Sequence, residues 1–295
     1  MRSLLENIDC PYCGESRSTP WANENGFTAV KCSGCGIVYV NPRPSISLIY
    51  EAVQTGVHTD VEHERTAIAR RVGAKVTFYK AILASMFDDV WQTRKHISWL
   101  DVGAGYGEVV EAVTLLATSG SKIEGIEPMK PKAAHAQARG LCIREAYVSD
   151  VQDKYDYVSV INVFSHIPDF RDFLKSVKNV LTVNGEILIE TGNTGDLQSR
   201  EDVPGELDLP DHLVFAGEKH IIGYLSESCF SILKIRRIRK DGFMNGAKNI
   251  VKKLLGRKVS LAIPYTSPYR SILIRAKLMS PKVWNGDISV DPVNQ

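Results

Sequence analysis

Four of the six cysteines stand in two close pairs near the start of the chain. They are Cys10, Cys13, Cys32 and Cys35, in the pattern C-x2-C-x18-C-x2-C. This spacing is typical of a tetrahedral four-cysteine zinc site, and Gly14 and Gly36 permit a tight turn after each pair. Because four thiolates close the coordination shell, we expect Zn2+ that is structural and substitutes for the core of a module of about 40 residues. Four reduced structural cysteines are the alternative.

A glycine-rich loop and two acids form a second constellation. Asp101–Gly107 reads D-x-G-x-G-x-G after an apolar strand pattern, and Glu108 stands where a dinucleotide loop has its third glycine. The loop therefore suits a ligand other than a pyrophosphate, and the carboxylate of Asp101 suits a cation or an ammonium group. Glu127 follows the next strand pattern, where a carboxylate can accept hydrogen bonds from ribose hydroxyls. Together these features describe S-adenosylmethionine; a glycine turn with an incidental glutamate is the alternative.

Histidine is suited to proton removal at neutral pH, and two of the seven histidines have motif support. We expect His212 to be a catalytic base that Asp211 orients or tunes, because both lie in a polar loop after the strand pattern at 185–190, where acceptor sites open in such folds. His166 is the second candidate, with packing at a helix start as its alternative role. The remaining histidines are expected at surface or helix positions: His58, His63, His96, His135 and His220. Cys142 and Cys229 are isolated and expected to be buried, unreactive thiols.

The elements that must position these residues alternate between strand and helix patterns. Short β-rich runs occur at 97–102, 122–126, 157–163 and 185–190, with helical stretches at 108–117, 131–139 and 170–181 between them. Such alternation predicts a parallel sheet with crossover helices. We expect a zinc-binding module at 1–44, a helical linker or cap at 45–95, a Rossmann-like domain at 96–280 and a loosely attached tail at 281–295. The acidic stretch 196–211 is expected to be a mobile lid or loop.

Composition gives no general attraction to nucleic acid or membrane. Lys and Arg total 36 against 34 Asp and Glu, a net charge of +2. The segment 10–35 holds only Arg17 and Lys31 as basic residues, a poor electrostatic footprint for a phosphate backbone. No apolar run approaches the roughly 20 residues of a membrane span, and no signal-peptide core precedes Cys10. We therefore expect a cytoplasmic protein with reduced thiols.

Taken together, the motifs resemble those of the class I S-adenosylmethionine-dependent methyltransferases. More narrowly, they are similar to the branch that carries an N-terminal four-cysteine zinc module and often methylates carbon atoms of nucleotide-linked deoxysugars. The matching stretches, which cover almost the whole chain, are Cys32–Pro44, Asp101–Gly107, Gly125–Pro128, Tyr155–Asp169 and Glu190–Asn193. Ser165 replaces the acid that usually precedes the histidine after the fourth strand, and Asp211 replaces a usual glutamate in the acid–histidine pair of the base site.

The resemblance implies a fold and a set of cofactor contacts. The implied fold is an α/β, Rossmann-like class I methyltransferase sheet, mostly parallel with a terminal antiparallel strand, plus the zinc module. The implied cofactor-binding residues are Asp101, Gly103, Gly105, Gly107, Glu127, Pro128, Met129, Ser149, Asp150 and Asn162. The glycines would line the methionine moiety, Glu127 would hold the ribose, and Asn162 would lie close to the sulfonium. Pro128 and Met129 would flank the adenine, and Ser149 or Asp150 would lie near its amine.

The resemblance implies a small-molecule methyltransferase whose acceptor is a nucleotide-linked or glycan sugar, methylated at carbon or oxygen with His212 as base. A nucleic-acid methyltransferase that grips its substrate with the zinc module is one alternative. Asn162-Val-Phe stands where exocyclic-amine methyltransferases carry Asn/Asp-Pro-Pro-aromatic, which counts against amino-group methylation. A non-catalytic adenosyl-binding protein is the other alternative, and the intact glycine loop argues against it.

Overall fold

The computed structural model describes residues 4–55, 65–93, 95–239 and 267–279. The expected tail at 281–295, together with His58 and His63, lies outside the described residues. The strands are β1 (Leu5–Glu6), β2 (Ser18–Glu24), β3 (Phe27–Cys32), β4 (Val38–Val40), β5 (Arg43–Pro44), β6 (Ser98–Val102), β7 (Lys122–Ile126), β8 (Ile143–Arg144), β9 (Tyr155–Ile161), β10 (Leu181–Gly192), β11 (Val214–Phe215), β12 (Phe230–Ile238) and β13 (Ser271–Leu278). The α-helices are α1 (Ile46–Thr55), α2 (Arg65–Met86), α3 (Asp88–Thr93), α4 (Glu108–Thr114), α5 (Lys130–Ala138), α6 (Phe170–Val180) and α7 (Glu218–Glu227).

Seven strands form the central sheet, in the order β12-β13-β10-β9-β6-β7-β8. The five strands from β10 to β8 pair in parallel, and β13, the last of the described strands, is antiparallel to both of its neighbours. The predicted mostly parallel sheet with a terminal antiparallel strand is therefore confirmed. Because parallel strands all end at the same edge, the segments after β6, β7, β9 and β10 meet there.

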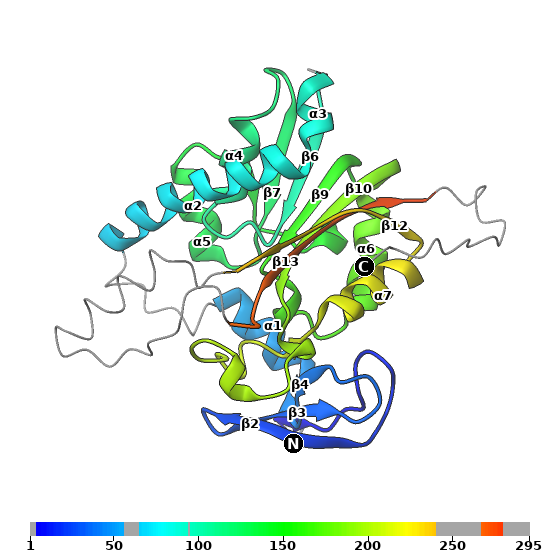
Figure 1. Ribbon diagram of the computed structural model, residues 1–295. Coiled ribbons are helices and arrows are strands. Elements are labelled where there is room, and N and C mark those ends of the chain that lie inside the picture. Colours follow the sequence, from blue (N-terminus) through cyan, green and yellow to red (C-terminus); the bar gives the residue numbers. More distant parts are fainter. Residues whose placement is uncertain (1–3, 56–64, 94, 240–266, 280–295) are drawn as a thin grey trace, which may run out of the picture.

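Helices cover both faces of this sheet, so its strands are buried on two sides (Figure 1). Alternate residues of β6 point to opposite faces of the sheet. Leu100 packs in a cluster with α6 and α7, while Trp99 packs in a cluster with α2, α3 and α4. Helix α2 contributes Val72, Val76, Tyr79, Ile82, Leu83 and Met86 to the second cluster. The helix therefore covers the face on which Asp101 also lies.

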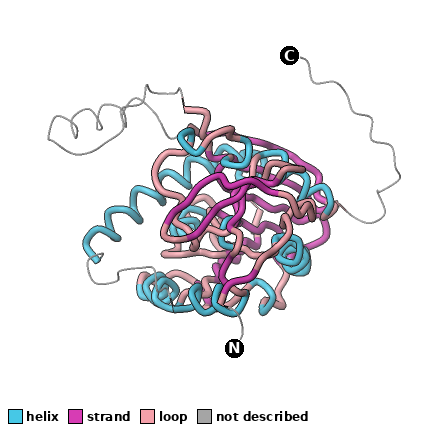
Figure 2. Tube along the Cα trace, turned by 90° about the horizontal axis from the view of Figure 1, so that it is seen from below, coloured by secondary structure: helices cyan, strands magenta, loops and turns pink. Residues whose placement is uncertain are grey.

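The N-terminal module is a second, smaller sheet in the order β11-β4-β3-β2. Its fourth strand comes from far along the chain, because Val214 in β11 pairs with Tyr39 in β4. Figure 1 shows the module beneath the central sheet, with α1 beside it, and Figure 2 shows the same strands from below. The module is thus joined to the part of the chain that forms the central sheet by strand pairing as well as by side-chain packing.

The acidic segment 196–211 is a loop, one of the two forms expected, but it packs against this module and does not project as a lid. Leu197, Val203, Leu207 and Leu209 are all buried, in one cluster with Val38 and Val40. Apolar residues at irregular spacing gave no period from which this burial could be predicted. Cys142 and Cys229 also differ from expectation, because both are exposed. Among the described residues, no helix is long and apolar enough to cross a bilayer.

Candidate active site

The glycine loop between β6 and α4 adopts backbone conformations that need glycine. Gly103, Gly105 and Gly107 have φ values of +71°, +55° and +86°. A Cβ at Gly103 would overlap Val163, and one at Gly107 would overlap Leu141. A Cβ at Gly105 would meet only the Glu108 carboxylate, at 3.8 Å, so that this glycine borders open space. The loop is therefore tightly packed at Gly103 and Gly107, and it leaves space for a ligand at Gly105.

Glu127 ties the ends of β6 and β7 together. Its side chain is buried, and its two carboxylate oxygens accept hydrogen bonds from the Gly105 N–H at 2.7 Å and the Met129 N–H at 2.9 Å. A carboxylate has about four acceptor positions, so positions remain for a ribose diol. Pro128 and Met129 follow at the start of α5 and border the same edge.

Four buried acidic residues lie at or just beyond the carboxyl ends of β6, β7 and β10. Asp101, Glu108, Glu127 and Glu190 are each at most 7% exposed. The pKa of Asp101 is raised to about 8, chiefly by burial and also by the charges of Glu108 and Glu127, while a 2.5 Å hydrogen bond from the Ser159 hydroxyl opposes the rise. A site that concentrates so many acids away from water suits a cationic ligand.

Tyr79 reaches this site from α2. Its hydroxyl accepts a hydrogen bond from Asn162 Nδ2 at 3.2 Å, and burial raises its pKa, with further increases from Glu190, Glu108 and Asp101. The sequence did not identify Tyr79, because only tertiary packing brings α2 to the sheet edge. Glu108 and Glu190 were also missed as site residues, although their places after the loop and at the end of β10 could have indicated them.

The remaining predicted cofactor residues, Asn162, Ser149 and Asp150, follow strands at the same edge of the sheet but are exposed. Asn162 directly follows β9, has φ +57° and is exposed. Ser149 and Asp150 follow β8 in a short 3-10 turn, and both are exposed. The carboxylate of Asp150 accepts the Tyr147 N–H at 2.9 Å, which closes that turn.

The two candidate base histidines lie in contact. Their ring centroids are 4.7 Å apart in an edge-to-face arrangement. His166 Nδ1 lies 3.0 Å from the Asp211 carbonyl oxygen and 3.6 Å from its carboxylate, and His212 Nδ1 lies 2.7 Å from the Leu207 carbonyl oxygen. A carbonyl can only accept, so each Nδ1 carries a proton, and in the neutral form of each ring the lone pair lies on Nε2.

The hydrogen-bond partners of the two histidines differ from the expected orientation of His212 by Asp211. Asp211 holds Nδ1 of His166, whereas the carbonyl of Leu207, not Asp211, holds Nδ1 of His212. Burial lowers the pKa of His212, and the neighbouring His166 lowers it further, against smaller opposing effects of Leu207 and Asp211. His212 is therefore neutral at physiological pH.

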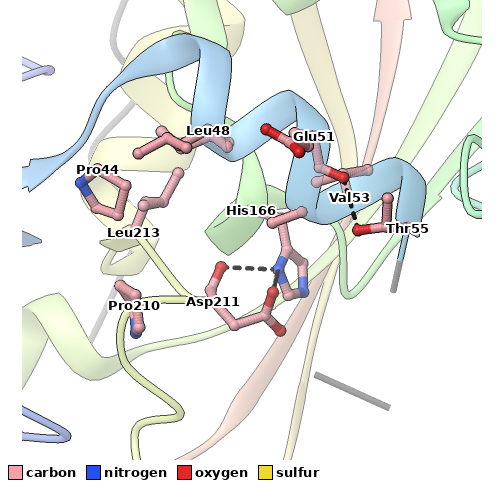
Figure 3. Close-up of a pocket in the computed structure, with 11 residues that line it drawn as sticks. Pro44, Leu48, Glu51, Val53, Thr55, His166, Pro210, Asp211 and Leu213 are labelled. Carbon is pink, nitrogen blue, oxygen red and sulfur yellow. Dashed lines mark hydrogen bonds and ion pairs between the residues drawn. The ribbon is translucent and has the colours of Figure 1, made fainter. Parts of the chain in front are cut away.

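A cavity of about 320 Å3 opens between α1 and the loop that contains Asp211 (Figure 3). Its apolar lining is Pro44, Leu48, Ile49, Ala52, Val53, Pro210 and Leu213, and its polar lining is Glu51, Thr55, His166 and Asp211. His212 is not among the lining residues and packs behind His166. The cavity thus combines a mostly apolar wall with one imidazole that can remove a proton.

The four cysteines converge as their spacing predicts. One ligand atom from each lies within 4.8 Å of all the others, and the closest sulfur pairs, Cys10–Cys35 and Cys13–Cys32, are 3.6 and 3.5 Å apart. Tetrahedral zinc with Zn–S bonds of about 2.3 Å separates its sulfurs by about 3.8 Å, so these residues fit that ion. Gly14 and Gly36 have φ values of +74° and +82°, as the tight turns require.

His220 lies in helix α7, one of the two positions expected for it, and it supports this cluster. It is fully buried, its Nδ1 accepts the Gly217 N–H at 2.9 Å, and its Nε2 therefore donates to the Cys35 carbonyl at 3.1 Å. His166, Asp211 and His212 also place one possible metal-ligand atom each within 4.8 Å of the others. With both Nδ1 protons engaged, however, their present arrangement is that of hydrogen-bonded imidazoles.

A family model described as a methyltransferase domain matches residues 71–227, more than half of the chain. The chain belongs to this family. The matched region runs from α2 to the end of α7 and includes the glycine loop, Glu127 and both candidate base histidines. The prediction of a methyltransferase domain of the S-adenosylmethionine-dependent class is confirmed.

Curated relatives match a shorter region of this methyltransferase. The chain is 28% identical over 104 residues to the ubiquinone biosynthesis O-methyltransferase of Aeromonas salmonicida, covering 32% of this chain and 42% of the relative. It is 32% identical over 108 residues to the enzyme of that name from Actinobacillus pleuropneumoniae, covering 32% and 45%. The chain thus spans less than half the length of these relatives.

Solved structures extend the likeness in fold. A SAM-dependent methyltransferase from Archaeoglobus fulgidus superimposes with a TM-score of 0.51 at 15% identity, over 68% of this chain and 94% of that one. Magnesium protoporphyrin IX methyltransferase from Synechocystis PCC 6803, solved with bound SAM, gives a TM-score of 0.46 at 13% identity, over 79% and 92%. The predicted methyltransferase fold is confirmed, whereas the nucleotide-sugar branch remains a prediction.

Proposed function

We propose that this protein transfers a methyl group from S-adenosylmethionine to a hydroxyl oxygen of a small molecule with an apolar face. The observation that carries the cofactor is the group of buried carboxylates at Gly105: Glu108 and Glu127 both contact this glycine, and Asp101 lies close enough to feel their charges. S-adenosylmethionine carries a sulfonium and an ammonium, and the acids offer both charges a counterion away from water. Glu127, already fixed by two backbone N–H groups, is placed to accept the ribose hydroxyls.

The cavity beside α1 supports the acceptor class. Seven of its eleven lining residues are apolar, which suits a flat or aliphatic acceptor body, while His166 provides a polar contact for a hydroxyl. The matched relatives are named O-methyltransferases, which agrees with an oxygen acceptor. A nucleotide-linked or glycan sugar, which the sequence indicated, would need more hydrogen-bonding side chains than these walls provide.

In the proposed mechanism, the residues mainly align and deprotonate the acceptor. Bound S-adenosylmethionine supplies an electrophilic methyl group, and alignment alone can lower the barrier by roughly 7–11 kcal/mol. His166 Nε2 accepts the hydroxyl proton, while the carbonyl and carboxylate of Asp211 hold Nδ1–H and stabilise the imidazolium that forms. His212, neutral and packed against that ring, fixes its position.

The cysteine module has a structural role in this proposal. Its four thiolates would hold one zinc ion in a closed shell, away from the reacting atoms. The two basic residues of the segment 10–35 are both engaged within the protein, since Arg17 pairs with Glu15 and Lys31 Nζ donates to the Leu197 carbonyl. This arrangement argues against a module that grips nucleic acid.

Calorimetric titration with S-adenosylhomocysteine tests the cofactor site. Glu127→Gln keeps one acceptor for the backbone N–H groups but loses the charge, and we expect its affinity for S-adenosylhomocysteine to fall by about tenfold. Glu127→Ala loses the acceptor and the charge, and we expect its affinity to fall by about 100-fold or more. Glu201→Ala, an exposed acid outside the site, is the control and should bind normally. Equal affinity in all four proteins would contradict the proposed ribose contact.

Methyl transfer from labelled S-adenosylmethionine tests the acceptor class. We expect label in phenolic or other apolar hydroxyl compounds, and none in nucleotide-linked sugars. Transfer to the sugars alone would overturn the acceptor proposal and restore the branch that the sequence resembles. Cofactor binding with no transfer to either class would favour a non-catalytic adenosyl-binding protein.

A further inference from the structure

The cysteine module contacts the loop that carries the acceptor-site residues. The carboxylate of Glu24, at the end of β2, accepts the Leu207 N–H at 2.9 Å and the Leu209 N–H at 3.1 Å. Next to it, Asn25 Nδ2 donates to the Leu209 carbonyl at 2.9 Å. The partners of these three hydrogen bonds lie 183, 184 and 185 positions apart in the sequence.

Leu207, which Glu24 contacts, also holds His212 of the candidate site. The Leu207 carbonyl accepts the proton on His212 Nδ1 at 2.7 Å. Glu24 fixes the N–H of Leu207, and the C=O of Leu207 fixes the tautomer and the ring orientation of His212. His212 in turn packs edge-to-face on His166, which lines the acceptor cavity. An unbroken series of contacts therefore runs from the module to the cavity wall.

The module also holds the backbone on the other side of these histidines. The Leu213 carbonyl accepts the Val40 N–H at 2.9 Å, and the Leu213 N–H donates to the Ser165 carbonyl at 2.7 Å. Leu213 directly follows His212, and Ser165 directly precedes His166. Strand β4 thus braces the main chain beside both imidazoles.

We propose that Glu24 is a positioning residue for the acceptor site, and that the cysteine module acts through it as a working part of that site. The inference deepens the proposed function and rests on it for the role of the two histidines. A carboxylate suits this place because it can accept from both N–H groups at once. A glutamine would accept only one and would turn an N–H2 group toward the other.

A glutamate that merely anchors a loop would stabilise the fold without acting on His212. The two roles differ in what happens when His212 is already absent. If Glu24 acts through His212, its replacement changes little in a His212→Ala background, because the group that it positions is gone. If Glu24 only stabilises the fold, its replacement has the same effect in both backgrounds.

The test uses Glu24→Gln, His212→Ala and the double variant in the full zinc-loaded chain. Glu206→Gln is the matched control, since it removes the same charge from an exposed position one residue before Leu207. Three quantities are measured: S-adenosylhomocysteine affinity, the 15N spectrum of the histidine rings, and kcat and KM for the best acceptor. The His212 signals are assigned by their loss in His212→Ala.

We expect cofactor affinity to stay within about twofold in all variants, because the cofactor edge does not touch Glu24. Glu24→Gln should convert His212 from a single Nδ1–H tautomer to a mixture and lower kcat by about 10- to 100-fold, as misplacement of a catalytic group does. In the His212→Ala background the same change should lower kcat by less than about twofold.

An unchanged His212 tautomer in Glu24→Gln, or an equal loss of kcat in both backgrounds, would overturn the proposal. If the wild-type protein methylates no acceptor, the proposed function fails, while the 15N spectrum still decides whether Glu24 positions His212. Glu206→Gln should match wild type in every measurement. A changed His212 tautomer in that control as well would show a general effect of charge and would also overturn the assignment to Glu24.

Discussion

Replacement of Asp101 by asparagine should stabilise the protein and weaken its cofactor binding. Asp101 is 2% exposed, and burial together with two neighbouring acids raises its pKa to about 8. At pH 7 the folded protein therefore holds a proton on Asp101 that the unfolded chain does not. Asparagine has the same shape, is neutral at every pH and can accept the Ser159 hydrogen bond in the same way.

The magnitude follows from the two pKa values. With about 3.9 for the unfolded chain and about 8 for the folded protein, uptake of the proton at pH 7 costs about 4 kcal/mol. Because the folded-state pKa is the higher one, the contribution of Asp101 to wild-type stability is greatest below pH 4 and falls by about 1.4 kcal/mol per pH unit up to pH 8. The asparagine variant lacks this slope, so its advantage should grow from near zero at pH 4 to about 4 kcal/mol at pH 7.

Denaturant unfolding of both proteins at pH 5, 6, 7 and 8, with zinc present, measures this difference, and calorimetry at each pH measures S-adenosylmethionine affinity. The cofactor's positive charge favours the ionised carboxylate, so wild-type affinity should rise with pH up to about 8, while the variant should bind weakly and without this dependence. A stability difference that is constant across these pH values would refute the reasoning, because Asp101 would then be ionised in the free protein.

Other perturbations separate the two halves of the site. His166→Ala should lower kcat by about 100-fold or more with unchanged S-adenosylhomocysteine affinity, whereas loss of cofactor binding would show a structural role instead. Because the pKa of His212 is lowered, its ring signals should titrate below the ordinary 6.5 by NMR, and a midpoint above 6.5 would contradict the burial seen here. Metal analysis should find one zinc per chain, and Cys32→Ser should abolish it and lower the melting temperature. Gly107→Ala should fail to bind cofactor, because its Cβ would overlap Leu141; normal binding would show that the loop adapts.

Local patterns made the cofactor half of the site predictable. Gly103, Gly107 and Glu127 lie within one β-α-β unit, where spacing along the chain determines position in space. The four cysteines were predictable for a similar reason, since each pair occupies its own tight turn. For these residues, the sequence identifies the chemistry because the ligand contacts are built from neighbours along the chain.

The sequence indicated His166, Asp211 and His212 as candidates, but not how they contact one another. Nothing near Asp211 indicates that it contacts His166, 45 residues earlier, and no motif marks the Leu207 carbonyl as the partner of His212. His220 lacked any motif because its partner, the Cys35 carbonyl, is 185 residues away. Strand β11 has only two residues, too few for an alternating pattern, yet it completes the module sheet.

The cofactor residues and the proposed acceptor cavity are built by different parts of the chain. The cofactor edge depends on residues of the β6–α4–β7 unit, whereas the acceptor cavity depends on α1, on the 207–213 loop and on the module that holds that loop. Substitutions in the module can therefore reshape the cavity through Glu24 and β4 without disturbing cofactor contacts. With the proposed zinc ion bound, the module would be rigid enough to hold the imidazoles while its strands and turns vary. Under the proposed function, the module would then act as a scaffold for acceptor selection and not as a separate binding domain.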